Sequence, residues 1–406
     1  MNIFKKSFCR FYQGCFRLAM PVLPYKKPRI AESVLELPYI LKEETTENVL
    51  IITDKIMSTH PSMAELKGAL RDASIAYNVY DNVQPNPTVQ DVEAALSVYK
   101  KSHADSLIAF GGGSAIDCAK AVGARAVYPK RSFASLKGDL RIWRRLPFLC
   151  AIPTTAGTGS EATLTAVITD PVKKHKYTMN SFPLIPQVAV LDPAVTYSLP
   201  PHLTATTGMD ALTHAVEAYI GQSTTKETRS ECKEAVRLVF ENIETAYTDA
   251  TNTEARKNML KSAFLAGDAF SKSYVGYIHA IAHSLGGQYG TPHGLANSVL
   301  LPILLESYGA AVYKPLAELA FSAGIAKAGA TQEENAKTFI KEIYAMNERM
   351  GIPKKLSGIK KEDIPKMARR ADREGNPLYP VPVLYDRKKL MTFYEAVADW
   401  SENNEN

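Results

Sequence analysis

Two pairs of side chains with metal-binding chemistry recur at one helical spacing. Asp210 and His214 are four residues apart in GMDALTHAVEAY. His279 and His283 repeat that spacing in YIHAIAHSLGGQYG, and His293 follows in TPHG after a glycine-containing turn. Residues four apart lie on one face of a helix. One carboxylate and several imidazoles, with no thiolate, suit a borderline divalent ion such as Fe2+ or Zn2+.

The spacing leaves the ligand set open. A single Asp/His pair at this spacing is more often helix-surface chemistry than a metal site, whereas two pairs and a third histidine are harder to explain in that way. His279 and His283 compete for one position, and spacing alone does not choose between them. We therefore predict a site for one divalent cation built from Asp210 and these histidines.

A glycine run offers a second kind of binding chemistry. The buried-strand pattern SLIAF (106–110) leads into three glycines at 111–113, and AIDCAKAVGARAV continues as a helical pattern. Bare amides at a helix N-terminus attract phosphate through unpaired N–H groups and the positive end of the helix dipole. Glycine also lets the ligand approach without a Cβ in the way. The run is not the GxGxxG fingerprint, so a tight turn without a ligand is the alternative interpretation.

A second loop, IPTTAGTGSEAT (152–163), follows another predicted strand. Two such loops at the ends of parallel strands form a crevice for an extended, phosphate-bearing ligand. Asp54, at the end of an earlier strand, is placed to accept hydrogen bonds from ribose hydroxyls and to repel a 2′-phosphate, which favours NAD over NADP. An acid after a strand is also common as a turn residue. The second loop carries hydroxyls on Thr154, Thr155, Thr158, Ser160 and Thr163.

The elements that must position these residues change character along the chain. Strand patterns alternate with helical patterns up to about residue 195, which predicts a parallel sheet with right-handed crossovers. Long amphipathic helical patterns dominate after Leu199. We predict a basic aromatic extension at 1–24, a dinucleotide-binding α/β domain at 25–198 and a helical metal-binding, catalytic domain at 199–406. The predicted strands are 48–53, 77–81, 106–110, 148–153 and 187–193.

Composition excludes several classes of protein. The 406 residues are 46% hydrophobic and 22% charged, as in folded globular proteins. No apolar run approaches the ~18 residues that span a bilayer. The five cysteines are scattered without a CxxC pair, which favours a reducing, cytoplasmic setting over a disulfide framework or a thiolate zinc site. Residues 1–30 hold seven basic side chains and no acid, which leaves 41 basic and 42 acidic residues elsewhere and no nucleic-acid footprint.

The basic N-terminal segment has a helical period. We favour a helix that packs on the protein's own body or across a dimer interface. The alternative is a helix that docks on a membrane surface or a partner protein. A cleaved secretory signal is not expected, because the segment lacks a continuous apolar core. One side of the helix would carry Phe4, Phe8, Phe11, Tyr12, Cys15 and Phe16, and the other Lys6, Arg10, Gln13 and Arg17.

Four motifs in order, GGGSAIDCAK, IPTTAGTGSEAT, GMDALTHAVEAY and HAIAHSLGGQYGTPHGLAN, make the chain resemble the iron-containing (group III) alcohol dehydrogenase family. The resemblance runs from about residue 25 to the C-terminus. It implies an N-terminal Rossmann-like α/β domain with a parallel sheet, followed by an all-α C-terminal metal-binding domain. This is the dehydroquinate synthase-like architecture, and in the family the active site lies in the cleft between the domains.

The resemblance also implies roles for single residues. His283 would lie beside the metal without ligating it, either as a proton relay or as a pocket-wall histidine. The family's usual metal is Fe2+, with Zn2+ in some members. The implied metal ligands are Asp210, His214, His279 and His293. The implied cofactor-binding residues are Asp54, Asn86, Gly112, Gly113, Ser114, Asp117, Thr154, Thr155, Thr158, Thr163 and Lys176.

One segment departs from the family pattern. Where many members carry a run of small residues beginning with Asn, this chain has KSYVGY at 272–277. Bulkier, hydroxylated side chains near the metal would reshape the substrate pocket. The stretch GNPLYPVPVLYD (375–386) also marks a distinct subgroup. No particular alcohol is therefore transferred from well-known members.

Together these features predict a metal-dependent NAD(H) oxidoreductase that interconverts a small primary or secondary alcohol and its aldehyde or ketone by hydride transfer. The alternative is another NAD- and metal-using enzyme on the same fold, similar to glycerol dehydrogenase or dehydroquinate synthase. A metal-dependent hydrolase and a scaffold acting through the N-terminus are further alternatives. The resemblance implies a homodimer or larger assembly. The only other partner expected is the small-molecule substrate, with no nucleic acid and no transmembrane segment.

Overall fold

The computed structural model describes residue 1 and residues 3–171 and 175–400, with the side chains of residues 21 and 175–177 excepted. Two compact units are present, and each is described by itself. The first comprises residues 24–199 and 250–267, and the second residues 1–23, 200–249 and 268–406. The domain limits 1–24, 25–198 and 199–406 stay predictions.

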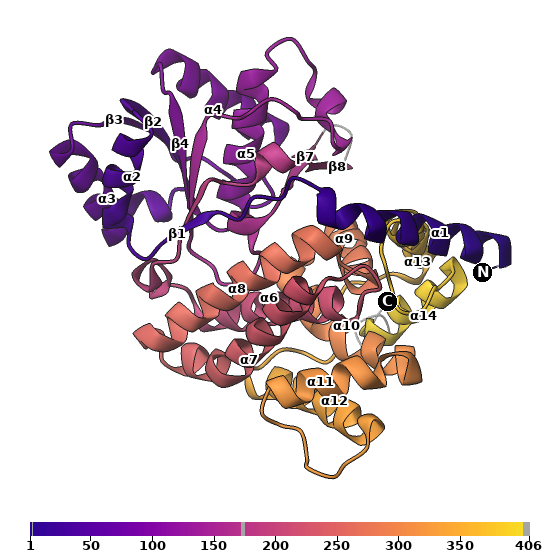
Figure 1. Ribbon diagram of the computed structural model, residues 1–406. Helices are drawn as coiled ribbons and strands as arrows, with labels where there is room; N and C mark the ends of the chain where they lie inside the picture. Colours follow the sequence, from indigo (N-terminus) through magenta and orange to yellow (C-terminus); the bar gives the residue numbers. More distant parts are fainter. Residues whose placement is uncertain (2, 172–174, 401–406) are drawn as a thin grey trace. The chain divides into compact units, whose positions relative to one another are not determined.

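The first unit is built on a six-stranded sheet in which every described pairing is parallel. The strand order is β1-β9-β6-β4-β2-β3 (Figure 1). This confirms the predicted α/β class with a parallel sheet. The strands are β1 (Arg29–Ala31), β2 (Asn48–Ile52), β3 (Ala76–Tyr80), β4 (Ser106–Gly111), β6 (Phe148–Pro153) and β9 (Val188–Val190).

Helices cover both faces of this sheet, which is why its central strands are apolar throughout. Successive side chains of a strand point to opposite faces. Leu50 and Ile52 of β2 pack in one core with α4 (Val89–Lys101) and α5 (Gly113–Val127). Val49 and Ile51 pack in the opposite core, with α2 (Leu37–Glu43) and α3 (Pro61–Asp72). Both faces of β2 are therefore buried, as in other parallel sheets.

A second, three-stranded sheet was not predicted from the sequence. β7 (Thr165–Asp170) pairs antiparallel with β8 (His175–Asn180), and β5 (Gly138–Asp139) pairs parallel with β8. β7 alternates buried and half-buried residues, and β5 has only two residues, so neither forms the continuous apolar run that marks the main sheet.

The second unit is helical, which confirms the predicted all-α C-terminal part. α6 is buried without a break from Gly208 to Ile220 and is therefore a core helix. The stretch His293–Ser322 is long and apolar enough to cross a membrane by length and composition, but 61% of its apolar window is buried inside the protein. α8 (Thr253–Ser273) belongs to the first unit up to residue 267 and to the helical unit from residue 268. The other helices are α1 (Ile3–Ala19), α6 (Pro201–Ile220), α7 (Lys226–Thr248), α9 (Tyr277–Tyr289), α10 (His293–Tyr308), α11 (Tyr313–Ser322), α12 (Gln332–Arg349), α13 (Ile364–Gly375) and α14 (Arg387–Val397).

Candidate metal centre and nucleotide-binding loops

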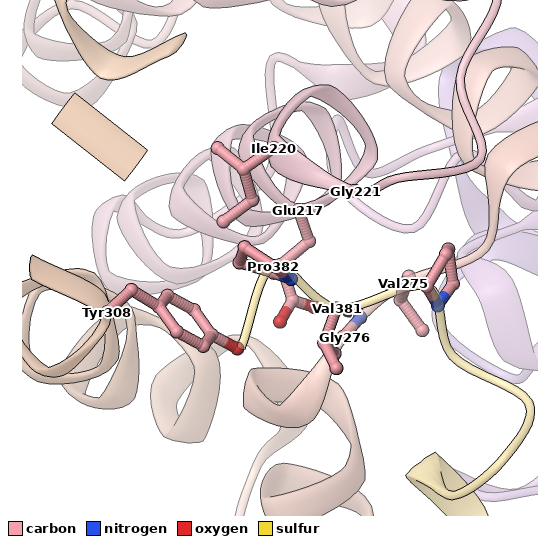
Figure 2. A pocket seen from close by; sticks show the side chains of 9 residues that line it. Glu217, Ile220, Gly221, Val275, Gly276, Tyr308, Val381 and Pro382 are labelled. Atoms are coloured by element: carbon pink, nitrogen blue, oxygen red, sulfur yellow. Dashed lines mark hydrogen bonds between the residues drawn. The ribbon is translucent and has the colours of Figure 1, made fainter. Parts of the chain in front are cut away.

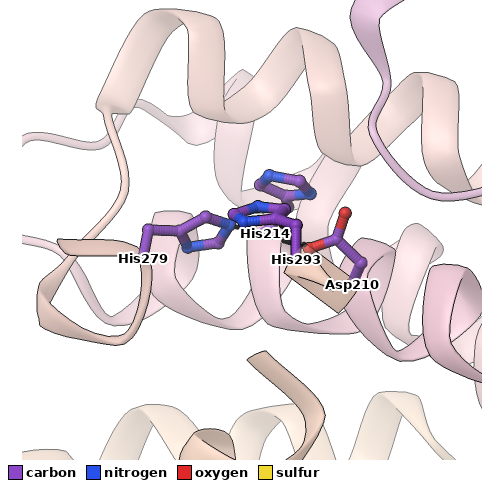
Figure 3. Close-up of side chains that lie close together, drawn as sticks. All are labelled: Asp210, His214, His279 and His293. Atoms are coloured by element: carbon purple, nitrogen blue, oxygen red, sulfur yellow. Dashed lines mark ion pairs between the residues drawn. The ribbon is translucent and has the colours of Figure 1, made fainter. Parts of the chain in front are cut away.

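Four side chains from three helices of the second unit converge on one point (Figure 3). Asp210 and His214 stand one turn apart on α6, His279 lies in the first turn of α9, and His293 is the first residue of α10. One possible ligand atom from each lies within 4.8 Å of the others. The Oδ1 atom of Asp210 is 3.5 Å from Nε2 of His293 and 3.9 Å from Nε2 of His279.

The turn between α9 and α10 positions His293. α9 ends at Gly290, whose positive φ of 71° is the left-handed conformation that favours glycine after a helix. Pro292 then directly precedes α10, which begins at His293. The turn GTPH therefore sets His293 on the opening turn of a new helix. Its side chain stays 37% exposed, whereas that of Asp210 is only 2% exposed.

A buried carboxylate orients His279. The Nδ1 atom of its ring lies 2.6 Å from Oε2 of Glu217 on α6. Burial, and then the neighbouring histidines, lower the pKa of His279 well below its usual value, so the ring is neutral. A neutral ring that donates through Nδ1 has its lone pair on Nε2, the atom that faces the cluster. This hydrogen bond therefore sets the tautomer that a metal ligand needs.

Glu217 also organises the backbone before α9. Its carboxylate accepts hydrogen bonds from the amides of Gly276, at 2.8 Å, and Ile278, at 2.9 Å. Burial raises the pKa of Glu217 to about 7, and these hydrogen bonds oppose that shift. A Cβ on Gly276 would lie 2.5 Å from Oε1 of Glu217, so only glycine fits here. Figure 2 shows Glu217 and Gly276 lining one small pocket together with Val381 and Pro382.

Asn297 places a polar donor among the ligand atoms. Its Nδ2 atom lies 2.6 Å from Oδ1 of Asp210, 3.2 Å from Nε2 of His279 and 3.1 Å from Nε2 of His293. Its Oδ1 atom is buried and has no hydrogen-bond partner among the described residues. Three ligand atoms thus face one positively polarised group. An arrangement of one carboxylate and three imidazoles with this polarity fits a divalent cation.

His283 lies beside the cluster and not among the converging ligand atoms. Its ring stacks on that of His293, with centroids 5.1 Å apart. Its Nδ1 atom is 2.6 Å from Oε1 of Glu374 on α13, and that oxygen also accepts a hydrogen bond from the hydroxyl of Tyr379 at 2.8 Å. The side chain of His283 is 38% exposed. One nitrogen of the His283 ring is therefore hydrogen-bonded to a carboxylate.

The predicted nucleotide loops meet in the first unit. β6, β4 and β2 are neighbours in the sheet, so their carboxyl ends share one edge. Gly112 caps α5, and Gly113 is its first residue. A Cβ at Gly112 would lie 3.4 Å from the side chain of Thr155, and one at Gly113 would lie 3.0 Å from that of Thr158. The glycine run and the threonine loop therefore lie against each other.

Four more predicted cofactor residues lie at this edge. Asp54 accepts hydrogen bonds through Oδ1 from the amides of Ile56 and Met57, and its Oδ2 lies 3.7 Å from the Cβ position at Gly111. The backbone amide of Asn86 donates to Oγ of Ser114 at 3.3 Å. Beside them, the amide of Thr154 donates to the carbonyl of Gly111 at 3.1 Å.

Two other predicted residues lie in a buried network behind the loops. The ammonium group of Lys120, fully buried, donates to Oγ1 of Thr163 at 3.0 Å and to Oγ of Ser160 at 3.2 Å. Asp117 accepts from the Ser160 hydroxyl at 2.7 Å and from the amide of Val167 at 3.0 Å. These contacts tie α5 to the threonine loop. The side chain of Lys176 lies outside the described residues.

Comparisons with known proteins agree with this architecture. Residues 30–193 match the family described as iron-containing alcohol dehydrogenase, and residues 204–398 match the C-terminal part of that family. A 1,3-propanediol dehydrogenase of Citrobacter freundii is 38% identical over 334 residues, which cover 81% of this chain and 86% of that protein. The chain belongs to the iron-containing alcohol dehydrogenase family.

Solved structures lead to the same family. A 1,3-propanediol oxidoreductase superposes with a TM-score of 0.87 at 32% identity, covering 91% of this chain and 98% of that one. The sulfoacetaldehyde reductase of Bifidobacterium kashiwanohense, solved in complex with NAD+, gives a TM-score of 0.80 at 29% identity, covering 92% and 98%. Family membership confirms the predicted enzyme class, with iron and NAD as the cofactors of the family.

Several residues of this alcohol dehydrogenase site were missed by sequence reasoning. Glu217 follows Asp210 by seven residues on α6, and Asn297 follows His293 by four on α10, so both lie on the helix face that carries a predicted ligand. Extending the helical spacing would have found them. Glu374 had no such signal, because it comes from a helix distant in the sequence.

The atypical 272–277 segment is engaged mainly with its own unit. Lys272 pairs with Asp268 at 3.0 Å and lies in a cluster with two further acids. Tyr277 is buried, and its hydroxyl donates to Oδ1 of Asn376 at 2.7 Å. Tyr274 has a positive φ of 61°. The expected effect of the segment on the substrate pocket stays a prediction.

Proposed function

We propose that this chain catalyses reversible hydride transfer between the carbinol carbon of a small primary or secondary alcohol and C4 of the nicotinamide of NAD. Membership of the iron-containing alcohol dehydrogenase family supports the reaction class. The observation that carries the proposal is the convergence of one carboxylate and three imidazoles within 4.8 Å of one another.

Asp210, His214, His279 and His293 would hold the metal. When bound, a divalent ion supplies Lewis acidity toward the alcohol or carbonyl oxygen. Asp210 brings the only negative charge of the four. The half-exposed position of His293 leaves one side of the cluster accessible to a small molecule. Fe2+ is the metal we propose, with Zn2+ as the alternative that the same donors accept.

His283 is the residue we propose for proton movement. Its Nδ1 atom is held on Glu374, which fixes the ring and directs Nε2 elsewhere. Its partial exposure gives the ring access to solvent. An imidazole has an unperturbed pKa of ~6.5, which suits proton exchange near neutral pH. His283 would thus carry the hydroxyl proton that alcohol oxidation releases.

The glycine and threonine loops would hold NAD. Amides at the start of α5 suit the pyrophosphate, because unpaired N–H groups and the helix dipole both favour an anion there. Asp54 would accept from the ribose hydroxyls and disfavour the 2′-phosphate of NADP. Asn86, Ser114 and the loop threonines surround the same edge of the sheet. Asp117 and Thr163 would act through the shape of the loop, because their polar atoms bind other parts of the protein.

We further propose a cytoplasmic enzyme that forms a homodimer or larger assembly. All five cysteines are free thiols, and four of them are buried, as is usual for proteins of reducing compartments. The substrate we propose is a short alcohol or aldehyde, in keeping with relatives named 1,3-propanediol dehydrogenase and lactaldehyde reductase.

The direct experiment is a screen of NADH oxidation by the iron-reconstituted protein against a panel of short aldehydes and ketones. At least one carbonyl compound should support turnover with NADH that depends on added metal. Absence of NADH oxidation with every member of the panel, in protein that contains one metal per chain, would contradict the proposal.

A further inference from the structure

The N-terminal helix α1 is attached to its unit through its polar side. The side-chain amide of Gln13 donates to the backbone carbonyls of Pro377, at 3.2 Å, and Tyr379, at 2.7 Å. The guanidinium of Arg10 donates to the carbonyls of Val381, at 2.7 Å, and Pro382, at 2.9 Å. These bonds satisfy carbonyls of the proline-rich segment after α13. Figure 1 shows α1, in indigo, alongside α13.

This attachment leaves most of the apolar side of the helix in solvent, although Phe16 at its edge packs against Tyr274, with ring centroids 4.8 Å apart. Phe4 is 83% exposed, Phe11 71% and Leu18 81%, and Ile3 and Phe8 are also exposed. At 3.6 residues per turn these side chains form one continuous stripe along the helix. Single exposed apolar residues are ordinary, but contiguous apolar faces of this kind mark interaction surfaces. Because Arg10 and Gln13 hold the polar side of α1 on its own unit, a partner would contact the apolar side.

Charges beside the stripe identify the kind of partner. α1 contains four lysines and arginines and no acid. Lys6 and Arg17 lie on the polar side with Arg10 and Gln13, but their own side chains are exposed. Lys5 pairs with Asp372 of α13 at 3.1 Å. Exposed aromatic rings bordered by cations are the composition of helices that lie in the interface of an anionic membrane.

A second copy of the chain fits this surface less well. Two copies meeting through α1 would bring together two helices that each carry four cations and no acid, and like charges repel at this range. Anionic lipid headgroups instead match the exposed cations, and acyl chains match the rings. We propose that α1 docks the enzyme on an anionic membrane surface through its outward apolar face, formed by Ile3, Phe4, Phe8, Phe11 and Leu18, with the exposed cations Lys6 and Arg17 reaching the headgroups.

The test uses substitutions on the outward face only, because truncation would also remove the Gln13 and Arg10 hydrogen bonds. The full-length protein is sedimented with vesicles of phosphatidylcholine alone, or of phosphatidylcholine with phosphatidylglycerol. The apolar variant is Phe4→Ser with Phe11→Ser. Its control is Phe321→Ser, since Phe321 is an exposed phenylalanine (63%) on α11. The charge variant is Lys6→Glu with Arg17→Glu, and its control is Lys314→Glu with Lys341→Glu, two exposed lysines of the same unit.

The wild type should bind the anionic vesicles and not the neutral ones, with binding that weakens as salt rises. Phe4→Ser with Phe11→Ser should lower the bound fraction at least tenfold and leave NADH-linked turnover unchanged, which shows that the variant is folded. The charge variant should lose binding, and both controls should keep it.

Three results would overturn the proposal. The first is no binding of the wild type to anionic vesicles. The second is equal binding by the wild type and the Phe4/Phe11 variant. The third is a change of oligomeric state in that variant, measured by light scattering, since this would show that a second copy covers the face. None of these results depends on the identity of the substrate, so the proposed function is tested separately.

Discussion

Glu217 offers a sharp test of how the metal site is built. The substitution Glu217→Gln keeps the side-chain volume and removes the charge. The carboxylate accepts three hydrogen bonds, from the amides of Gly276 and Ile278 and from Nδ1 of His279. A glutamine offers one acceptor oxygen and turns an NH2 group toward N–H donors. At least one buried donor is then left unsatisfied, or the His279 ring must change tautomer and lose its lone pair toward the metal.

Both consequences have a magnitude. An unsatisfied buried donor costs about 1–3 kcal/mol, so the free energy of unfolding of the metal-free protein should fall by that amount. Loss of a carboxylate behind a ligating histidine typically lowers metal affinity about 10–100-fold. Fe2+ affinity should therefore fall by one to two orders of magnitude, and Zn2+ affinity in parallel.

The assays are urea unfolding of the metal-free protein and calorimetric metal titration, with Zn2+ in air and Fe2+ under anaerobic conditions. Glu241→Gln serves as the control, because Glu241 lies on the exposed side of α7. A Glu217→Gln variant with wild-type metal affinity and wild-type free energy of unfolding would refute the role of Glu217 in setting the His279 tautomer.

Three further substitutions probe other parts of the chain. Burial lowers the pKa of Lys120 to about 8 from its ordinary 10.5, so between these pH values the unfolded state binds more protons than the folded state. The free energy of unfolding should therefore rise with pH from 8 to 10.5, and Lys120→Met should abolish that rise in urea unfolding measured over this range. Asp54→Asn keeps an oxygen for the Ile56 and Met57 amides but removes the charge, so the ratio of kcat/KM for NADPH over NADH should rise by about tenfold, and an unchanged ratio would remove Asp54 from cofactor selection. Gln13→Ala should lower the free energy of unfolding by about 1–3 kcal/mol, because the carbonyls of Pro377 and Tyr379 lose their donor; equal urea midpoints would contradict this.

Patterns that repeat within a few residues were readable from the sequence. The apolar run at 48–53 predicted a buried strand, and β2 is indeed buried from Val49 to Ile52. The four-residue spacing of Asp210 and His214 placed both on one side of a helix, and the structure brings them together with His279 and His293. What the spacing left open was the choice between His279 and His283. In the structure Nδ1 of His279 lies on Glu217, and Nδ1 of His283 lies on Glu374.

Features that depend on distant contacts were not readable. Glu374 on α13 contacts His283 from 91 residues further along the chain, and no local sequence pattern predicts that contact. The wheel of the N-terminal helix separated its polar and apolar sides, but it did not show which side contacts the protein. That outcome depends on carbonyls at 377–382, which Arg10 and Gln13 satisfy.

The central claim is that one divalent metal, held by Asp210, His214, His279 and His293, is required for NAD-linked chemistry. The most direct measurement is metal content per chain together with NADH-linked aldehyde reduction in Asp210→Ala and His279→Ala, with His202→Ala as the control because His202 is exposed on α6. Both site variants should lose metal and turnover together, and the control should keep both. Retention of stoichiometric metal and of turnover in Asp210→Ala and His279→Ala would contradict the claim.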